Sequence, residues 1–358
     1  MTQGYHPDVL PQSSAYEAVK RGAGMRDRSA EGRLGVSGSD RADWLQGLVT
    51  NDVKALAPGR GCYAAYLTPQ GRILSDLRLL ALDDAFLIDV PGETLALLLQ
   101  RFEQFIITED VHVWDRTSEL GRLAVYGPEA TRIVAASFAT SGERVASLTE
   151  HQHTTVRWSG VDALIAGSRD LGAIGFDVYV PPSHLPQLEH VLREAGVVSL
   201  DEATWHALRV DAGQPLFGVD MTDDTIPLEA GIEDRAISLT KGCYVGQEVI
   251  IRVLHRGQGR VARRLVKLVE TPVPLPVGGH PDATPPPASA PQQPGLPRFV
   301  RGATIASGDR DVGRVTSAAW SPGVGRSVGL GYVRRELAEP GTRLEVLSGS
   351  ERVEVSVG

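Results

Sequence analysis

The sequence predicts an α+β fold of two or three packed units, the last of which is a small β domain. Strand-like and helix-like patterns alternate over residues 40–212, a proline-rich segment interrupts the chain at 271–298, and short β-rich runs follow it to residue 357. At 358 residues the chain is longer than the roughly 250–300 residues at which a single core stops growing, so more than one core is expected.

The first unit is predicted to be an antiparallel sheet with a helix on one face. A helix is expected at about 40–49, where Asp40 supplies an N-cap. Strand-like runs at 62–68, 72–82 and 85–90 are separated by short turns, which is typical of a meander. Leucines and phenylalanines then recur at helical spacing over 93–106, which predicts a helix that covers this sheet.

The same kinds of pattern recur in the next part of the chain. Strands are predicted at 123–126, 154–158, 163–166 and 176–180, and helices at about 183–194 and 201–212. The predicted domain boundaries are therefore 1–120, 121–259 and 260–358.

The third domain is predicted to be a small barrel or sandwich. Its β-rich runs lie at 302–305, 312–319, 328–333, 343–347 and 352–357. Residues 265–269, ahead of the proline-rich segment, are expected to supply the first strand of this domain. Segment 271–298 is therefore predicted to be an extended insertion within the domain.

The composition indicates the cellular compartment of the protein and the kinds of partner it can bind. The only cysteines are Cys62 and Cys243, which excludes a disulfide framework and favours the reducing cytoplasm. No stretch reaches about 18 consecutive apolar residues, and the N-terminal residues lack the pattern of a signal peptide, so no membrane contact is predicted. The formal net charge of −8 argues against general nucleic-acid binding, although residues 249–267 hold six basic residues and no acid.

The motif KGCYVGQE at 241–248 is the strongest candidate for chemistry. Its candidate catalytic residues are Lys241, Cys243, Gln247 and Glu248. Cys243 lies between Gly242 and Gly246, which allow backbone N–H groups to face an anion. Lys241 is expected to favour the thiolate, since a free thiol of pKa about 8.5 is only a few per cent ionised at neutral pH. The alternative is a glycine turn with a buried, inert Cys243.

This octapeptide resembles the motif of the YgfZ family of folate-binding proteins, which are relatives of the glycine-cleavage T protein, an aminomethyltransferase. The resemblance extends along most of the chain and excludes only the proline-rich insertion. It includes the segments 36–40, 48–53, 208–215, 227–231, 312–317 and 321–322.

The resemblance implies a GcvT-like disc of three domains, with antiparallel sheets, helices and a C-terminal β-barrel around a central folate cavity. The first domain would be the GcvT-like N-terminal part, and the ferredoxin-like second domain would carry the motif. The implied cofactor is tetrahydrofolate or a derivative, and no metal ligands are implied. The implied cofactor contacts are Trp205, Arg209, Gly242, Tyr244 and Gly246.

Three departures separate this sequence from the aminomethyltransferase pattern. Aminomethyl transfer in the T protein uses an aspartate that the resemblance places within residues 91–105, and this segment contains none. Ala173 stands where the T protein carries a pterin-binding glutamate, and Cys243 stands where it carries an aspartate. The absence of these carboxylates predicts that the protein is not a T-protein-type aminomethyltransferase and leaves open whether it is an enzyme.

Two of the implied cofactor contacts have a second interpretation. Trp205 either stacks on a folate ring or, three residues before Leu208 on one helix, belongs to the core. Arg209 either clamps a folate carboxylate or pairs with Asp211 or Glu229.

Two further features carry weaker predictions. The basic stretch 252–267 is interpreted as solvated strand edges, as a contact for folate polyglutamate, or as a docking surface for an acidic partner or RNA. Cys62 is expected to be buried.

Two hypotheses about function follow. The first is a tetrahydrofolate-binding accessory protein of the YgfZ type that acts in iron-sulfur cluster assembly or repair through Cys243. Iron-sulfur client proteins are then the expected partners, and tRNA modification is affected indirectly. The alternative is a tetrahydrofolate-dependent aminomethyltransferase or demethylase.

Overall fold

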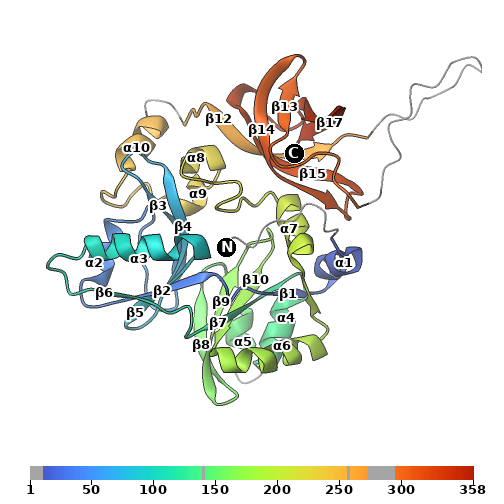
Figure 1. The fold of residues 1–358 in the computed structure, drawn as a ribbon. Coiled ribbons are helices and arrows are strands. Elements are labelled where there is room, and N and C mark those ends of the chain that lie inside the picture. The colour runs from blue at the N-terminus through green and yellow to red at the C-terminus, as the bar shows by residue number, and fades with distance from the viewer. Residues whose placement is uncertain (1–10, 139–141, 256–258, 273–294) are drawn as a thin grey trace, which may run out of the picture.

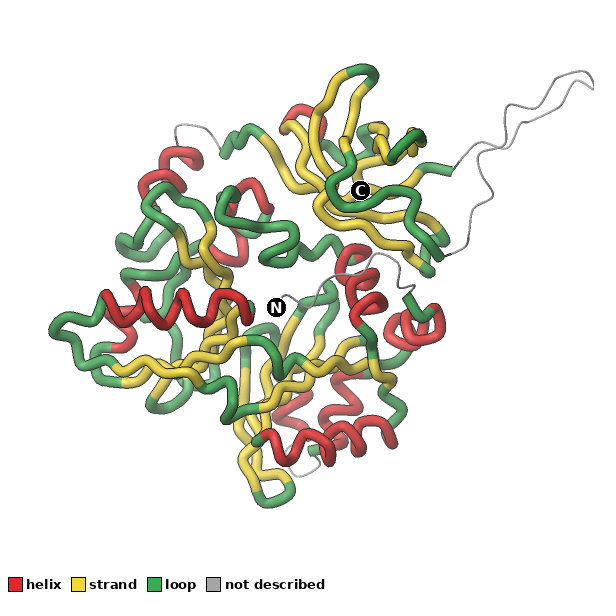
Figure 2. Tube along the Cα trace, in the orientation of Figure 1, coloured by secondary structure: helices red, strands yellow, loops and turns green. Residues whose placement is uncertain are grey.

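The computed structural model describes residues 11–138, 142–255, 259–272 and 295–358. Two open sheets and one closed barrel form this part of the chain (Figure 1). Figure 2 shows helices beside the two open sheets and mostly strands in the C-terminal body. The predicted α+β class with a C-terminal β-barrel is confirmed. None of the helices in these described ranges has the length and apolarity to cross a membrane.

The first open sheet has five antiparallel strands in the order β3-β4-β5-β2-β6. Its strands are β2 (Gly32–Ser37), β3 (Gly61–Leu67), β4 (Ile73–Ala81), β5 (Ala85–Val90) and β6 (His112–Asp115). The helices beside it are α2 (Arg41–Gln46) and α3 (Leu95–Gln104). Leu98 and Phe102 of α3 are fully buried in the core of this sheet, as their helical spacing predicts.

The second open sheet has six strands in the order β11-β1-β7-β10-β9-β8. Its strands are β1 (Gly24–Asp27), β7 (Gly121–Tyr126), β8 (His153–Trp158), β9 (Val161–Ser168), β10 (Gly175–Val180) and β11 (Val198–Ser199). β1 precedes the first sheet in the chain and yet pairs with β7 and β11. The segment before the first sheet therefore packs with the second unit.

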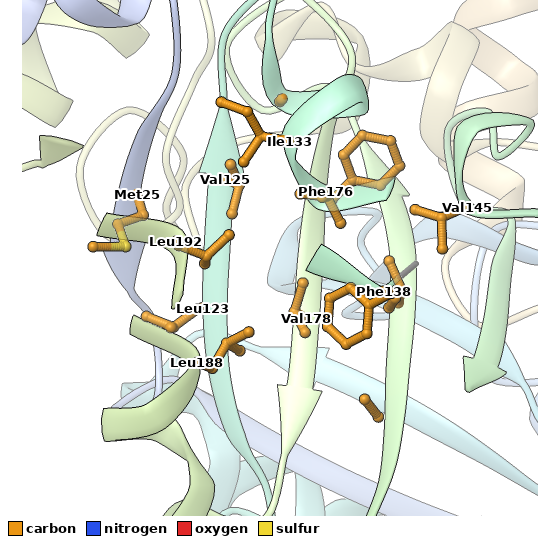
Figure 3. Close-up of a cluster of buried hydrophobic side chains, with 14 of the residues drawn as sticks. Met25, Leu123, Val125, Ile133, Phe138, Val145, Phe176, Val178, Leu188 and Leu192 are labelled. Carbon is orange, nitrogen blue, oxygen red and sulfur yellow. The ribbon is translucent and has the colours of Figure 1, made fainter. Parts of the chain in front are cut away.

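Helices cover one face of the second sheet. They are α4 (Ala130–Ser137), α5 (Gly142–Ala146) and α6 (Leu185–Glu194). Figure 3 shows the apolar cluster between the sheet and these helices, where Val125 and Phe176 of the strands meet Ile133 and Leu188 of the helices. Each fully buried side chain of this size stabilises the fold by roughly 1.5–3 kcal/mol. Because side chains alternate along a strand, Asp177 lies on the opposite face, which is turned toward the first sheet.

Helix α7 (Glu202–Asp211) connects the second sheet to the barrel. Asp201 caps it, since its Oδ1 accepts a hydrogen bond from the backbone N–H of Thr204 over 2.7 Å. Helix α1 (Ser13–Arg21) packs beside α7, and Tyr16 donates its hydroxyl to Asp211. Apolar residues of both helices share one core with the barrel strands β14 and β15, defined below.

The C-terminal domain is a closed barrel in the order β12-β15-β14-β13-β16-β17. Its strands are β12 (Arg263–Glu270), β13 (Thr304–Ser307), β14 (Arg310–Ser321), β15 (Arg326–Arg334), β16 (Arg343–Ser348) and β17 (Glu351–Val357). β12 precedes the proline-rich segment and pairs with β15 and β17, so this segment is an insertion within the barrel, as predicted. The predicted extended conformation of 271–298 concerns residues that lie mostly outside the described ranges.

Short helices lead from α7 to the barrel. They are α8 (Pro227–Ala230), α9 (Glu233–Ala236) and α10 (Gln247–His255), and 3-10 turns occur at Gly92–Thr94, Pro182–His184 and Arg335–Leu337. The interpretation of the basic run 252–267 as strand edges is wrong for 252–255, which belong to α10, whereas 263–267 lie in β12. The apolar residues of α10 at 249, 250, 253 and 254 have helical spacing, and Ile250 is fully buried.

Candidate functional site

The two open sheets face each other across a layer of buried charges. Asp177 of β10 is fully buried and accepts hydrogen bonds from Arg78 of β4 and from Arg122 of β7, the latter over 2.8 Å. Burial alone would raise the pKa of Asp177, but the guanidinium groups of Arg122 and Arg78 hold it well below its usual range. These charges satisfy one another, so this layer joins the sheets.

Asp76 lies at one end of this layer. Residues 76 and 78 of β4 share a face, because side-chain direction repeats every two residues. The Asp76 side chain is half-buried, and Tyr63 of β3 donates its hydroxyl to Oδ2 over 2.8 Å. Burial raises the pKa of Asp76 to about 6, with the Tyr63 hydrogen bond acting against this rise and Glu31 adding to it. A carboxyl group with this pKa can exchange protons near neutral pH.

Partly exposed charged side chains lie around Asp76 and Tyr63. Arg28 donates to Glu31 over 2.7 Å and also to Asp170, and these two carboxylates are 26% and 27% exposed. The charges of Arg28 and Glu31 shift the pKa of Asp76, and the charges of Asp170 and Arg235 shift the pKa of the Tyr63 hydroxyl. Solvent therefore reaches a set of interacting charges, which we term the charged basin. The charged basin consists of Arg28, Glu31, Tyr63, Asp76, Asp170 and Arg235.

The second sheet adds two buried hydroxyls beside the charged basin. Ser168 of β9 pairs with Gly175 of β10, and Tyr126 of β7 flanks the same glycine; a Cβ on Gly175 would lie 3.3 Å from the Tyr126 ring and 3.4 Å from Ser168 Oγ. Within the described residues neither hydroxyl has a hydrogen-bond partner. The charge of Arg28 lowers the pKa of the Tyr126 hydroxyl and that of Asp170 raises it, so both charges lie near this hydroxyl. Since buried polar groups are normally paired, these hydroxyls are candidate ligand contacts.

Cys243 is exposed and Cys62 is buried. The alternative of a buried, inert Cys243 is therefore wrong. Burial raises the pKa of the Cys62 thiol to about 12, against the opposing charge of Lys241, so Cys62 is a packed and protonated residue as expected.

Lys241 anchors the motif to the first unit. Its ammonium donates to the backbone carbonyls of Gln46, Val49 and Asn51 over 2.6, 2.5 and 3.0 Å. An ammonium group has three N–H donors, so all three are used and none is left for the thiolate of Cys243. This corrects the expectation that Lys241 serves the Cys243 thiol, because its donors serve the backbone of the 46–51 loop.

Gln247 and Glu248 form the start of α10. Glu248 is exposed and pairs with Arg252 one turn later, and Gln247 donates its backbone N–H to the Tyr244 carbonyl. Both side chains stay predicted site residues beside Cys243.

Packing accounts for two further residues of the motif. Gly246 has φ +84°, and a Cβ there would lie 2.4 Å from the Thr68 carbonyl oxygen, so the close approach of two turns requires glycine. The Tyr244 ring is buried 5.1 Å from the Lys241 ammonium, and burial raises the pKa of its hydroxyl to about 12. Gly242 is exposed with open space around it.

Trp205 is 4% exposed and belongs to the core between α1, α7 and the barrel. The Arg26 guanidinium lies 3.9 Å from its ring centroid, and Arg209 lies 5.9 Å from it. The ring surface expected to stack on folate is therefore covered by Arg26. The indole Nε1 is buried and has no hydrogen-bond partner within the described ranges.

Arg209 is a buried structural cation. It donates to Asp220 over 2.7 Å and to Ser317 of β14 over 2.8 Å. Its ion-pair partner is Asp220 and neither Asp211 nor Glu229, which corrects the predicted pairing. Because Arg209 is 1% exposed and engaged in this way, the predicted clamp on a folate carboxylate is not supported by its position.

Comparison with known proteins identifies the family. The GCVT N-terminal domain matches residues 10–241, and the glycine cleavage T-protein C-terminal barrel domain matches residues 292–358. The chain belongs to the glycine cleavage T-protein family. The aminomethyltransferase of Rubrobacter xylanophilus is 30% identical over 321 residues, which cover 90% of this chain and 78% of that protein. The aminomethyltransferase of a Nostoc species is 30% identical over 341 residues, covering 92% and 82%.

A solved relative shows the same fold. The glycine cleavage system aminomethyltransferase T from Bartonella henselae matches with a TM-score of 0.80 at 22% identity, over 99% of this chain and 92% of that one. The GcvT-like architecture expected from the sequence is confirmed.

The charged basin bears on the expectation that this T-protein family member lacks the carboxylates of an aminomethyltransferase. The expectation that a proton-handling carboxylate is missing rested on residues 91–105, and the half-buried Asp76, whose pKa is raised to about 6, lies outside that segment. A signal was present in the sequence: Asp76 and Arg78 interrupt an otherwise mostly apolar strand on one face. Likewise, Asp170 lies three residues before Ala173 and brings a carboxylate to the charged basin.

The basic stretch after the motif is largely neutralised. Acidic side chains pair with four of its described basic residues: Arg252 with Glu248 of the same helix, Arg263 with Glu229, Arg264 with Glu233, and Lys267 with Asp211. Arg260 has no ion-pair partner within the described residues. Such paired groups attract a polyanion only weakly, so RNA or polyglutamate binding gains no support from this stretch.

Proposed function

We propose that the protein is a tetrahydrofolate-dependent transferase of the aminomethyltransferase type, with Asp76 as the residue that handles the proton. The observation that carries this proposal is the half-buried Asp76 carboxyl, whose pKa is raised to about 6 under the Tyr63 hydroxyl. The names of two relatives support it, since the Rubrobacter xylanophilus and Nostoc proteins, matched over 78% and 82% of their length, are aminomethyltransferases.

The residues beside Asp76 fit a folate. Within the described residues, the hydroxyls of Tyr126 and Ser168 are buried without a hydrogen-bond partner, and Asp170 offers a carboxylate for the amino groups of a pterin. The Nε1 of Trp205, in the core shared by α1, α7 and the barrel, is a further buried donor without a partner in the described part of the chain. When bound, tetrahydrofolate supplies ring nitrogens that accept a one-carbon unit. In this arrangement Trp205 contributes its indole N–H instead of its ring face.

Asp76 performs the proton transfer. At neutral pH its carboxylate is mostly ionised, because the pKa of about 6 lies below the ambient pH. Tyr63 occupies Oδ2, so Oδ1 is the atom that accepts a proton from an amine and returns it to the departing amine. Tyr63 holds the carboxyl in place during both transfers.

Turnover with defined substrates tests this function. Purified protein with tetrahydrofolate and an aminomethylated carrier is expected to form methylenetetrahydrofolate and to release ammonia and the free carrier. Asp76→Asn should lower the rate by about 10²-fold or more while tetrahydrofolate affinity stays within a few fold, since general acid–base catalysis contributes typically 10²–10⁴. Asp162→Asn is the matched control, because Asp162 is an exposed residue paired with Arg157. Absent turnover, or an Asp76→Asn variant with full rate, would contradict the proposal.

A second function is favoured by the exposed Cys243. In this alternative the protein is a YgfZ-type accessory factor of the cytoplasm that binds tetrahydrofolate and uses the thiol in iron-sulfur cluster assembly or repair, with effects on tRNA modification through its client enzymes. Gln247 and Glu248 would assist the thiol. Cys243→Ala should then abolish rescue of iron-sulfur enzyme activities in a strain that lacks the protein and should leave tetrahydrofolate affinity unchanged. Retained rescue would remove the thiol from the function.

A further inference from the structure

A hollow of about 370 Å³ lies outside the charged basin, where the first sheet, the α8 segment, α10 and the barrel meet. This volume is within the roughly 300–1,000 Å³ of small-molecule sites, which often lie where domains meet. Ile226 and Val249 contribute apolar walls. Its charged lining residues are Arg72, Asp224, Glu229 and Arg263.

The charged residues form two ion pairs that leave part of their hydrogen-bonding capacity unused. Arg72 Nη1 donates to Asp224, and Arg263 donates through Nε to Glu229 and through Nη2 to the Asp224 carbonyl. In the described part of the chain, Arg72 Nη2 and Arg263 Nη1 have no hydrogen-bond partner, and Asp224 Oδ2 and Glu229 Oε1 likewise accept no hydrogen bond there. The hollow therefore offers both donors and acceptors to a ligand.

Charge balance selects the class of ligand. Two guanidinium groups and two carboxylates give the lining a formal charge of zero. A ligand with one charge would be attracted by the two lining groups of opposite sign and repelled by the two of the same sign, whereas a zwitterion can satisfy both kinds at once. The Arg72 and Arg263 side chains are 47% and 42% exposed, so such a ligand can reach them from solvent.

We propose that this hollow binds a small aliphatic α-amino acid. The ligand carboxylate lies against Arg72 and Arg263, the ammonium lies against Asp224 and Glu229, and the hydrocarbon side chain lies against the wall formed by Ile226 and Val249. The site goes beyond the proposed transferase function, because it contains no member of the charged basin and does not include Cys243.

Valine and its two single-charge analogues test the site. Ligand-detected NMR on the full chain is expected to show binding of valine, with isovalerate, which lacks the amine, and isobutylamine, which lacks the carboxylate, each at least about tenfold weaker. Arg72→Gln and Arg263→Gln should each weaken valine binding by about tenfold or more. Arg352→Gln is the matched control, since Arg352 is a similarly exposed arginine paired with Glu345 in the barrel.

The possible outcomes separate this site from the transferase site. Valine binding that is unchanged in Asp76→Asn but lost in Arg72→Gln and Arg263→Gln supports the proposal whatever the result of the turnover assay. The proposal is overturned if valine does not bind, if either analogue binds as well as valine, or if both arginine variants, with thermal unfolding unchanged, bind valine like the wild type.

Discussion

The phenol oxygen of Tyr63 lies 2.8 Å from Oδ2 of Asp76, although the two residues are not direct partners in the sheet. Tyr63 on β3 pairs with Arg78 on β4, and Asp76 pairs with Ala65, so the contact is a diagonal one between neighbouring strands. Arg78, on the same face as Asp76, reaches Asp177 of the second sheet. One strand thus supplies both the ion pair that joins the sheets and the carboxyl group of the charged basin.

Asp76→Asn is expected to raise the free energy of unfolding at pH 7 by about 1–2 kcal/mol. The folded-state pKa of about 6 lies above the unfolded value of about 3.9, so stability from the protonated carboxyl is fully present below about pH 4 and is lost as the pH rises through about 6. Asparagine does not ionise and escapes this loss. Urea unfolding should separate the two proteins at pH 7 and bring them together near pH 4; a variant that is less stable at pH 7 would disprove the ionisation argument.

Tyr63→Phe is expected to raise the pKa of Asp76 by roughly one unit. The Tyr63 hydrogen bond favours the ionised carboxyl, and one pKa unit corresponds to 1.36 kcal/mol, about the energy of such a bond. A titration followed by the aspartate carboxyl carbon shifts in NMR measures the change. Tyr66→Phe should leave the titration unaltered, because Tyr66 lies three residues further along β3, on the opposite face, and packs against Phe102. A pKa of Asp76 that stays constant or falls in Tyr63→Phe would exclude this role for the hydroxyl.

Gly246→Ala should lower the free energy of unfolding by about 2–3 kcal/mol. The residue has φ +84°, and the new methyl group would lie 2.4 Å from the Thr68 carbonyl oxygen, so one of the two backbones must move. Gly242→Ala in the same motif is the control, since a Cβ there meets open space, and it should change stability by less than about 0.5 kcal/mol. Equal effects of the two substitutions in urea unfolding would show that the close approach is not what requires glycine.

Much of the fold could be predicted because its signals are local. The alternating runs at 62–68, 72–82 and 85–90 correspond to β3, β4 and β5, and the apolar spacing over 93–106 corresponds to α3. The strand at 265–269 could be assigned to the barrel across the insertion because the β-rich runs beyond it needed a partner. Helix α10 has a local signal as well, because its apolar residues at 249, 250, 253 and 254 have helical spacing.

The charged basin could not be predicted in the same way. Asp76 and Gly175 are about 100 residues apart, and their proximity depends on how two sheets pack face to face. The pKa of Asp76 comes from burial, which no short motif encodes. The contacts of Lys241 could not be predicted from the sequence either. Its partners are backbone carbonyls in the 46–51 loop, and every residue carries such a carbonyl, so no residue type marks them.

Lys241→Met is expected to lower the free energy of unfolding by about 2–3 kcal/mol. Methionine fills a similar volume but leaves the carbonyls of Gln46, Val49 and Asn51 without their donor, and unpaired buried polar groups cost about 1–3 kcal/mol. Lys54→Met is the control, because Lys54 is 52% exposed and pairs only with Asp43 at the surface. Chemical unfolding compares the two, and a loss in Lys241→Met no larger than that in the control would show that the anchor does not stabilise the fold.

Asp220→Ala should be among the most destabilising single substitutions, at about 3–5 kcal/mol. Asp220 accepts hydrogen bonds from Arg209 of α7 over 2.7 Å and from Thr316 and Ser317 of β14, both over 2.6 Å, so it joins the helix to the barrel. Its removal leaves the Arg209 guanidinium, which is 1% exposed, buried without its counter-ion.

A double-mutant cycle separates the ion pair from the packing around it. Arg209→Met with Asp220→Ala should cost less than the sum of the single changes by about 1–3 kcal/mol, because the second substitution removes the charge that the first left unpaired. Urea unfolding monitored by tryptophan fluorescence measures all four proteins, and Trp205 lies in the same core as α7. Additive losses would mean that Arg209 and Asp220 contribute through separate contacts, and the connection between α7 and the barrel would then rest on the shared apolar core.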